Sequence, residues 1–204
     1  MSQPSKRATI VVIVVVTAVA GLFIIGIDEL LHERIALAQG EVLRQTLREI
    51  PMPPYDNDPV RDMLEVSPTT PAAINPQRVF RVRQHGVPVG VYISVASSGY
   101  GGEMRLLIGI RFDGVVMGVH VLDHSETYGF GEEITAQDAD WLHRFEARSL
   151  SDPGAERWAV TQDGGDFDAV SGATATSRAV VNAVRYALEY YTAQRNELFT
   201  KPSL

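Results

Sequence analysis

Cysteine is absent from this chain of 204 residues. Without it there can be no disulfide, no thiolate catalysis, no zinc–thiolate site and no iron–sulfur cluster ligated by the protein. Any redox function must therefore come from a bound cofactor. Positive charge is also in short supply, because 18 Lys and Arg stand against 25 Asp and Glu, for a formal net charge of −7. This acidic balance argues against nucleic acid as a partner.

Familiar catalytic and repeat signatures are missing as well. The chain has no Gly-x-Ser-x-Gly hydrolase elbow and no repeat with a period of about 20 to 50 residues. Segment 94–102 is rich in Ser and Gly but lacks the Gly-Lys-Ser/Thr ending of a P-loop, and we interpret it as a loop. His120, Asp123, His124 and Glu126 resemble metal ligands. In a strand, residues four apart are separated by about 13 Å, so His120 and His124 could share an ion only across a turn.

Charge is missing altogether from residues 8–27, which are apolar and long enough as a helix to cross a bilayer core of about 30 Å. We therefore predict a transmembrane helix. A cleaved signal peptide would have a shorter apolar core, and no small-x-small cleavage site follows. Lys6 and Arg7 precede the span and Asp28 follows it, so the positive-inside rule places the N-terminus in the cytoplasm and everything after Ile27 outside.

The rest of the chain predicts an α+β domain in which helices pack on an antiparallel sheet. Apolar spacing indicates a helix over residues 28–50, which Pro51 to Pro54 end, and loop-like composition follows at 67–76. Runs rich in β-formers, with His85-Gly86 and Asp113-Gly114 as hairpin turns, predict strands over 78–84, 87–97, 104–112 and 115–122. The two tryptophans, Trp141 and Trp158, are more typical of a core than of a cofactor contact.

The most informative segment joins a Ser/Gly/Thr-rich turn, residues 171–176, to an amphipathic helix that begins near Ser177. The hydroxyls of Thr174, Thr176 and Ser177 stand where a helix N-cap is needed, and Gly172 lets the backbone approach a ligand closely. A helix N-terminus favours an anion such as phosphate, to which Arg178 could add one charge. Taken alone, the same residues could simply cap the helix.

Residues 158–187, WAVTQDGGDFDAVSGATATSRAVVNAVRYA, resemble the FMN-binding domain of the G subunit of Rnf (Rsx) electron-transport complexes, a family related to the C subunit of the sodium-pumping NADH:quinone reductase. The resemblance implies that FMN is attached through a phosphoester to Thr174, with Thr176 as the near alternative. The motif of that family falls here on Asp168, Ser171, Gly172, Ala173 and Thr174. The resemblance also implies that Asp168 presents or activates the Thr174 hydroxyl during modification. On the residues alone, an ordinary surface Asp in a loop is an equal alternative.

A second resemblance covers residues 99–131. In the family this region ends in a loop that helps to form the flavin pocket, and here the loop is His124-Ser125-Glu126-Thr127-Tyr128-Gly129-Phe130-Gly131. The family's Pro and Leu are replaced by Tyr128 and Phe130, which restores a backbone N–H and frees φ at the first of these positions. The resemblance therefore implies that the residues that match the family's loop contribute to the cofactor site, namely Glu126, Thr127, Gly129 and Gly131. Either new ring could pack near the flavin, and for Phe130 the protein core is the alternative.

Together these features predict a bacterial inner-membrane flavoprotein subunit with one covalent FMN, relaying electrons within an Rnf-type ion-translocating complex. Its expected partners are the other subunits, a flavin transferase that uses FAD and a divalent metal, and membrane lipid; it is not expected to be a complete enzyme alone. The expected divisions are a cytoplasmic segment 1–7, the span 8–27, a juxtamembrane part 28–77 and a periplasmic FMN-binding domain 78–204 that forms one unit with 28–77. The alternatives are the C subunit of the sodium pump and a cofactor-free anchored binding or assembly module.

Overall fold

The computed structural model describes residues 17, 40–66, 74–127, 132–135 and 139–202, and the chain divides into two compact units, Met1–Gln45 and Thr46–Leu204. Residues 40–49 are helical, in agreement with the later part of the predicted helix 28–50. The predicted span 8–27 lies outside the described residues except for Thr17. Of the helices formed by described residues, none combines the length and the apolarity that crossing a membrane requires.

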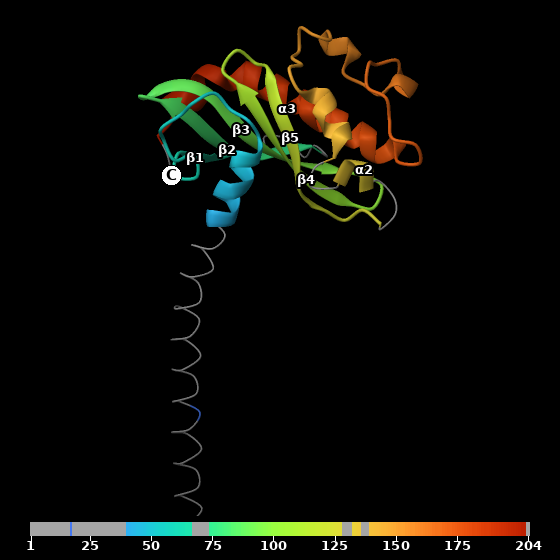
Figure 1. Ribbon diagram of the computed structural model, residues 1–204, viewed down its shortest axis with the longest axis horizontal. Helices are drawn as coiled ribbons and strands as arrows, with labels where there is room; N and C mark the ends of the chain where they lie inside the picture. Colours follow the sequence, from blue (N-terminus) through green and yellow to red (C-terminus); the bar gives the residue numbers. More distant parts are fainter. Residues whose placement is uncertain (1–16, 18–39, 67–73, 128–131, 136–138, 203–204) are drawn as a thin grey trace, which may run out of the picture. The chain divides into compact units, whose positions relative to one another are not determined.

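A five-stranded antiparallel sheet forms the centre of the second unit, with its strands in chain order (Figure 1). The strands are β1 Met63–Glu65, β2 Asn75–Gln84, β3 Val87–Ser98, β4 Glu103–Arg111 and β5 Val116–His124. The antiparallel sheet and the four long strands confirm the predicted α+β fold, whereas the short β1 was not predicted. The interpretation of 94–102 as a loop is wrong for its first half, because β3 continues as far as Ser98, which pairs with Glu103.

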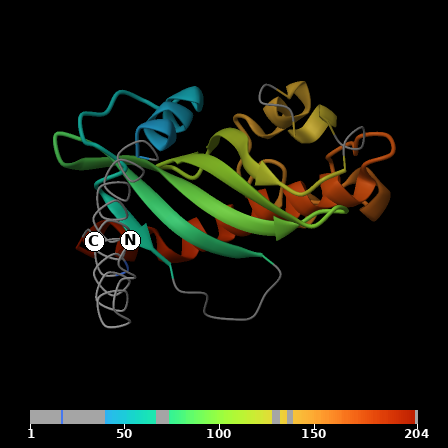
Figure 2. The same ribbon diagram turned by 90° about the horizontal axis from the view of Figure 1, so that it is seen from below.

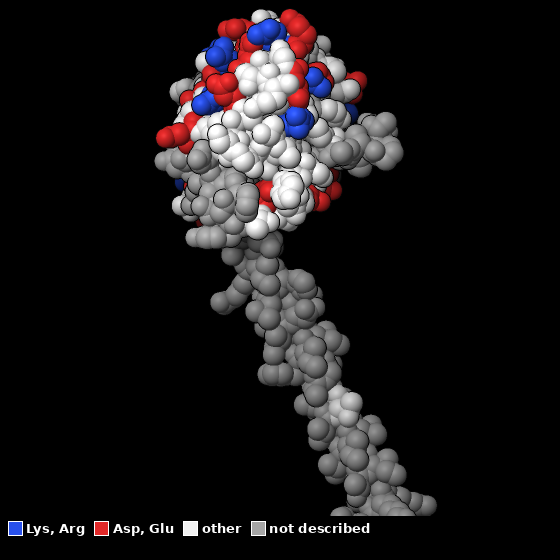
Figure 3. All heavy atoms as spheres, turned by 90° about the vertical axis from the view of Figure 1, so that its right-hand side faces the viewer, with Lys and Arg blue, Asp and Glu red and all other residues white. Residues whose placement is uncertain are grey.

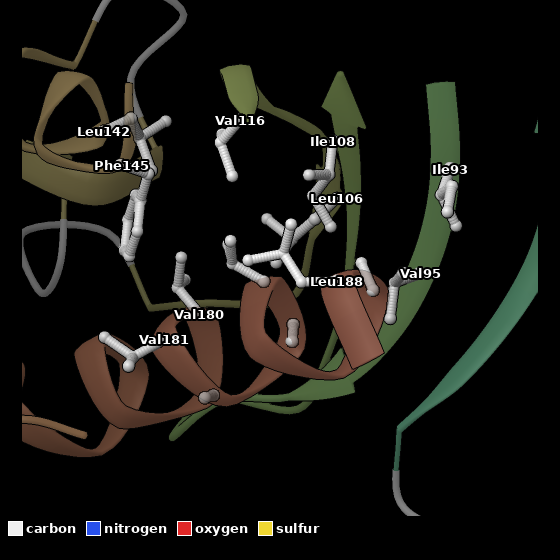
Figure 4. Close-up of a cluster of buried hydrophobic side chains, with 14 of the residues drawn as sticks. Ile93, Val95, Leu106, Ile108, Val116, Leu142, Phe145, Val180, Val181 and Leu188 are labelled. Atoms are coloured by element: carbon white, nitrogen blue, oxygen red, sulfur yellow. The ribbon is translucent and has the colours of Figure 1, made fainter. Parts of the chain in front are cut away.

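The long helix α3, Thr174–Thr200, crosses one face of the sheet and contacts β2, β3 and β4 (Figure 2). Its predicted amphipathic face is confirmed, because Val180, Val184 and Leu188 are buried. The close-up in Figure 4 shows helix side chains such as Val180 and Leu188 facing apolar residues of the strands, among them Leu106 and Ile108. This packing fixes the direction of α3 and hence the place of its N-terminus.

Between β5 and α3 the chain forms a layer of short helices, which lies beside the N-terminal part of α3 (Figure 1). These are α2 Glu132–Thr135, η1 Asp140–Phe145, η2 Ala155–Arg157 and η3 Thr161–Asp163. Four aromatic rings hold the layer together, with centroid distances of 5.3 Å for Trp141–Phe145, 5.0 Å for Phe145–Phe167 and 4.8 Å for Trp158–Phe167. Both tryptophans are buried, as the sequence predicted.

The other end of α3 is held by two arginines of β2. The Arg81 guanidinium is buried, donates to the carbonyl oxygen of Leu198 at 3.0 Å and pairs with Asp62. Arg83 donates to Asp62 at 2.9 Å and to the carbonyl oxygen of Phe199 at 3.1 Å. Cations at a helix C-terminus complement the macrodipole and satisfy carbonyls that have no intrahelical partner. The sheet thus fixes α3 at its far end, which helps to hold the N-terminus in place.

Candidate functional site

The N-terminus of α3 is an open helix end. Gly172 has φ +78°, a left-handed conformation that glycine adopts without strain, and the helix begins two residues later at Thr174. The predicted capping by hydroxyls is wrong, because the N-cap is Ala173 and no side chain caps the helix. Among the described residues, no protein group accepts a hydrogen bond from the N–H groups of Thr174, Ala175 and Thr176. Free donors at a helix N-terminus suit a phosphate.

The two candidate threonines lie in different environments. Thr174 is only partly buried, and within the described part of the chain its hydroxyl makes no hydrogen bond. Thr176 is 1% exposed, and its Oγ1 donates to Glu126 Oε1 at 3.0 Å. Thr174 is therefore partly exposed with a hydroxyl that has no hydrogen bond within the described residues, whereas the Thr176 hydroxyl is buried and bonded to Glu126.

The remaining motif residues build the turn. Ser171 and Gly172 are exposed, and Ala173 is buried. The next hydroxyl along the helix, that of Ser177, is fully buried, where it donates to the carbonyl oxygen of Ala173 and accepts from the N–H of Val170, both at 3.0 Å. Ser177 thus fixes the turn from inside, which leaves Ser171 and Gly172 on the surface beside Thr174.

Asp168 does not meet the predicted nucleophile in this structure. Its side chain is 73% exposed and pairs with Arg144 at 3.4 Å, while its backbone oxygen accepts from Trp141 Nε1 at 2.8 Å. Nor does Arg178 present a free charge to the helix end. It donates to both carboxylate oxygens of Asp163, at 2.5 and 2.9 Å, and these hydrogen bonds hold the pKa of Asp163 below its usual value.

Every aspartate in the segment 163–168 is paired with an arginine. The pairs are Asp163 with Arg178, Asp166 with Arg157, and Asp168 with Arg144. Figure 3 looks onto this end of the molecule and shows acidic and basic side chains interspersed over its upper part. Because these arginines are already engaged, the α3 end offers a phosphate mainly backbone N–H groups.

Glu126 ties three segments together. Its Oε1 accepts from the N–H of Tyr100 at 2.9 Å and from Thr176, and its Oε2 accepts from the N–H of Gly101 at 3.0 Å. The predicted site residue Glu126 is therefore brought to the motif, through Thr176. Thr127 is exposed and has no contact with the motif among the hydrogen bonds of the described residues. Gly129, Gly131 and the two aromatic replacements, Tyr128 and Phe130, lie outside the described residues.

The turn between β3 and β4 belongs to the candidate site, although no role was predicted for it. A Cβ on Gly99 would lie 1.9 Å from Glu126 Oε1, and one on Gly101 would lie 2.4 Å from the carbonyl oxygen of Ser125. Only glycine allows this close approach. Tyr100, between the two glycines, is 76% exposed. The run Gly99-Tyr100-Gly101-Gly102 could have indicated this role from the sequence, because clustered glycines indicate close backbone packing.

A separate cavity of about 410 Å³ lies elsewhere in the second unit. Its polar lining consists of Glu49, His120, His143 and Glu146, with His120 Nδ1 3.5 Å from Glu49 and His143 Nδ1 2.6 Å from Glu146. No residue of the motif lines it. Within the part of the chain that the structure describes, no group of three or more His, Asp or Glu could hold a metal ion.

Comparisons with known proteins match this chain to a family of FMN-binding domains and to subunits of ion-translocating oxidoreductase complexes. Residues 99–189 match the FMN-binding domain family. The G subunit of the ion-translocating oxidoreductase complex of Pseudomonas aeruginosa is 39% identical over 176 residues, which cover 84% of this chain and 82% of that protein. The G subunit of the same complex from Pseudoalteromonas atlantica is 38% identical over 83% of this chain and 80% of its own length. The G subunit from Cereibacter sphaeroides is also 38% identical, over 80% of this chain and 74% of its own length. The crystal structure of Shewanella oneidensis NqrC matches with a TM-score of 0.48 at 28% identity, covering 61% of each chain.

Proposed function

Because the chain belongs to the family of G subunits of ion-translocating oxidoreductase complexes, we propose that it is the flavoprotein subunit that relays electrons in such a complex. The cofactor is FMN, which the matched domain family binds. When bound, the flavin supplies the electron transfer, and the protein contributes its position and surroundings. The chain therefore works as one redox-active subunit among several rather than as a complete enzyme.

We further propose that Thr174 carries this FMN through a phosphoester. The single observation behind this assignment is a contrast on one helical turn: Thr174 is partly exposed and its hydroxyl has no hydrogen bond among the described residues, whereas Thr176 is 1% exposed and its hydroxyl bonds to Glu126. The residues fit a phosphate group, because the backbone N–H groups of the first three helical residues have no acceptor among the described residues. Gly172 adds room, since none of the described residues beyond its chain neighbours has an atom within 4 Å of where its Cβ would be.

Attachment is a phosphoryl-type transfer catalysed by a separate flavin transferase with FAD and a divalent metal. The Thr174 oxygen forms a bond to the phosphorus of the FMN moiety, the phosphoanhydride bond of FAD breaks, AMP leaves, and the hydroxyl proton goes to solvent or to the transferase. An unperturbed Thr hydroxyl is a poor nucleophile, so the partner must supply its activation. Asp168, exposed and paired with Arg144 in this structure, is placed in a surface loop where a transferase could engage it.

Fluorescence of a denaturing gel tests the covalent link. Protein produced together with its flavin transferase should fluoresce after denaturation, because only a covalent flavin survives that treatment. Thr174→Val, which removes the hydroxyl with little change in volume, should abolish the signal. Thr161→Val, the same change at an exposed threonine of η3, should retain it. A wild-type band without flavin fluorescence would contradict covalent attachment, and fluorescence in Thr174→Val would contradict the site.

We also propose the membrane arrangement that the sequence predicts: a cytoplasmic segment 1–7, a span 8–27, and a periplasmic part 28–204, of which residues 46–204 form one compact unit. The support is the uncharged run 8–27 with Lys6 and Arg7 before it and Asp28 after it. A phosphatase fused after Leu204 should be active in the periplasm. An inactive phosphatase together with an active cytoplasmic reporter at the same position would show the opposite topology and contradict this arrangement.

The two alternatives from the sequence are less well supported. Relatives that are 38 to 39% identical are named as G subunits of the ion-translocating complex, which favours that complex over the sodium-pumping reductase. In a cofactor-free module, the hydroxyls of the motif would serve as helix caps. Within the described part of the chain, however, no side chain caps the helix and the Thr174 hydroxyl makes no hydrogen bond.

A further inference from the structure

We propose that Glu126 is a positioning residue that determines which hydroxyl of the motif receives the flavin, by engaging Thr176 and leaving Thr174 available. This inference rests on the proposed function, since it concerns the same covalent site. It assigns to Glu126 a role that acts through Thr176, whereas the sequence resemblance implies a direct part in the cofactor pocket.

The hydrogen bonds of the Glu126 carboxylate carry the argument. A carboxylate accepts several hydrogen bonds, and this one accepts two from backbone N–H groups, those of Tyr100 and Gly101. The third comes from Thr176 Oγ1 at 3.0 Å. The two backbone bonds fix the position of the carboxylate, and the third fixes the rotamer of Thr176. The turn 99–102, the end of β5 and the first turn of α3 are thus joined at one side chain.

Close packing prevents this arrangement from relaxing easily. A Cβ at Gly99 would lie 1.9 Å from Glu126 Oε1, and a Cβ at Gly101 would lie 2.7 Å from Glu126 Cα. The backbone of the turn is therefore in direct contact with Glu126. Thr176, on the other side of the carboxylate, is 1% exposed, so its hydroxyl is buried where it bonds to Glu126.

The opposite interpretation makes Glu126 a general base that activates Thr176, since a hydroxyl hydrogen-bonded to a carboxylate is a common arrangement for a nucleophile. Burial argues against it, because a phosphoryl donor must reach the attacking oxygen and Thr176 is almost fully covered. Thr174 lies on the same helical turn, is partly exposed and has no competing hydrogen bond among the described residues. The Glu126 carboxylate therefore keeps the Thr176 hydroxyl hydrogen-bonded and out of reach of the donor. Because the same contact anchors the first turn of α3, it also holds Thr174 in its partly exposed position.

Site-resolved mass spectrometry of full-length protein produced with flavin transferase tests this role. Trypsin should release residues 158–178 as one peptide that contains both threonines, so fragmentation is needed to assign the adduct. Wild type should be modified on Thr174, and Thr174→Val should lose the adduct entirely. In the double variant Thr174→Val/Glu126→Ala the adduct should reappear on Thr176. Thr174→Val/Glu103→Ala, which removes an exposed carboxylate at the start of β4, is the matched control and should remain unmodified.

Near-ultraviolet circular dichroism of the buried Trp141 and Trp158 reports whether each variant is folded. The second variant is Glu126→Gln in the Thr174→Val background. Gln keeps the side-chain volume, but its amide has one oxygen where the carboxylate has two, so the N–H groups of Tyr100 and Gly101 must share that oxygen. Modification of Thr176 in Thr174→Val, with Glu126 intact, would overturn the proposal. So would a folded double variant that stays unmodified. An unmodified wild type would instead overturn the proposed covalent function itself, and this inference with it.

Discussion

Trp141 Nε1 donates a hydrogen bond of 2.8 Å to the carbonyl oxygen of Asp168. This bond joins η1 to the segment that leads into α3, and the Trp141 ring also meets Phe145 edge-on at 5.3 Å between centroids. The aromatic cluster therefore supports the turn that precedes Thr174 as well as filling the core. Residues far from the motif in sequence thus contribute to the geometry of the candidate flavin site.

Replacing Trp141 with Phe should weaken this support. A phenyl ring replaces the larger indole, so both the N–H donor and part of the buried volume are lost, and the free energy of unfolding should fall by roughly 1 to 3 kcal/mol. The extent of flavin attachment should fall with it. Trp158→Phe is the control, because Trp158 donates to Ser149 at 3.0 Å, away from the motif. Urea unfolding and intact mass measure both effects, and equal attachment in the two variants would contradict the supporting role.

The two adjacent glycines of the 163–168 segment serve different needs. Gly164 has φ +85° with open space around it, whereas a Cβ on Gly165 would lie 1.9 Å from the carbonyl oxygen of Ala159. Gly165→Ala should therefore displace the loop and lower the melting temperature strongly. Gly164→Asn should be well tolerated, because Asn adopts the left-handed conformation more readily than most residues. Thermal unfolding of both variants distinguishes them, and a stable Gly165→Ala protein would refute this view of the loop.

Arg81→Met should destabilise the domain severely. The side chain is 1% exposed, and its loss removes the buried one of the two arginines that pair with Asp62, together with the donor to the carbonyl oxygen of Leu198. Breaking one side of a buried ion pair costs about 3 to 5 kcal/mol. Arg61→Met, at a side chain that is 84% exposed, should change stability by less than about 0.5 kcal/mol. Chemical unfolding checks both values; similar midpoints for the two variants would show that Arg81 is dispensable.

Alkaline pH should destabilise the fold partly through Tyr191. Burial, the largest cause, raises the pKa of its phenol from 10.0 to about 12. The folded state then holds the proton more tightly than the unfolded chain, so this contribution is complete below about pH 10 and is lost as the pH rises toward 12. Tyr191→Phe should show a smaller loss of stability than wild type over that range. Urea midpoints measured at several pH values test this prediction. An identical decrease of the midpoint with pH in Tyr191→Phe and wild type would contradict it.

The sequence predicted the parts of the fold that depend on local patterns. The amphipathic face of α3 and the four long strands follow from residue spacing and β-formers, and the structure has them. The short helices between β5 and α3 were not predicted, because rings distant in the chain hold them rather than a periodic pattern. The predicted hydroxyl cap failed because Ala173 occupies the N-cap, and the Thr176 hydroxyl bonds instead to Glu126, 50 residues away in sequence. Tertiary contacts overrode the local preference at the site itself.

Fragmentation of the flavin-bearing peptide is the most direct test of the central claim that Thr174 carries FMN. Wild-type protein produced with its transferase should yield the peptide 158–178 heavier by FMN less one water. The fragments should place that mass on Thr174, and Thr176→Ser should leave it there because Ser keeps the hydroxyl that bonds to Glu126. An unmodified wild-type peptide, or an adduct localised to Thr176, would contradict the account.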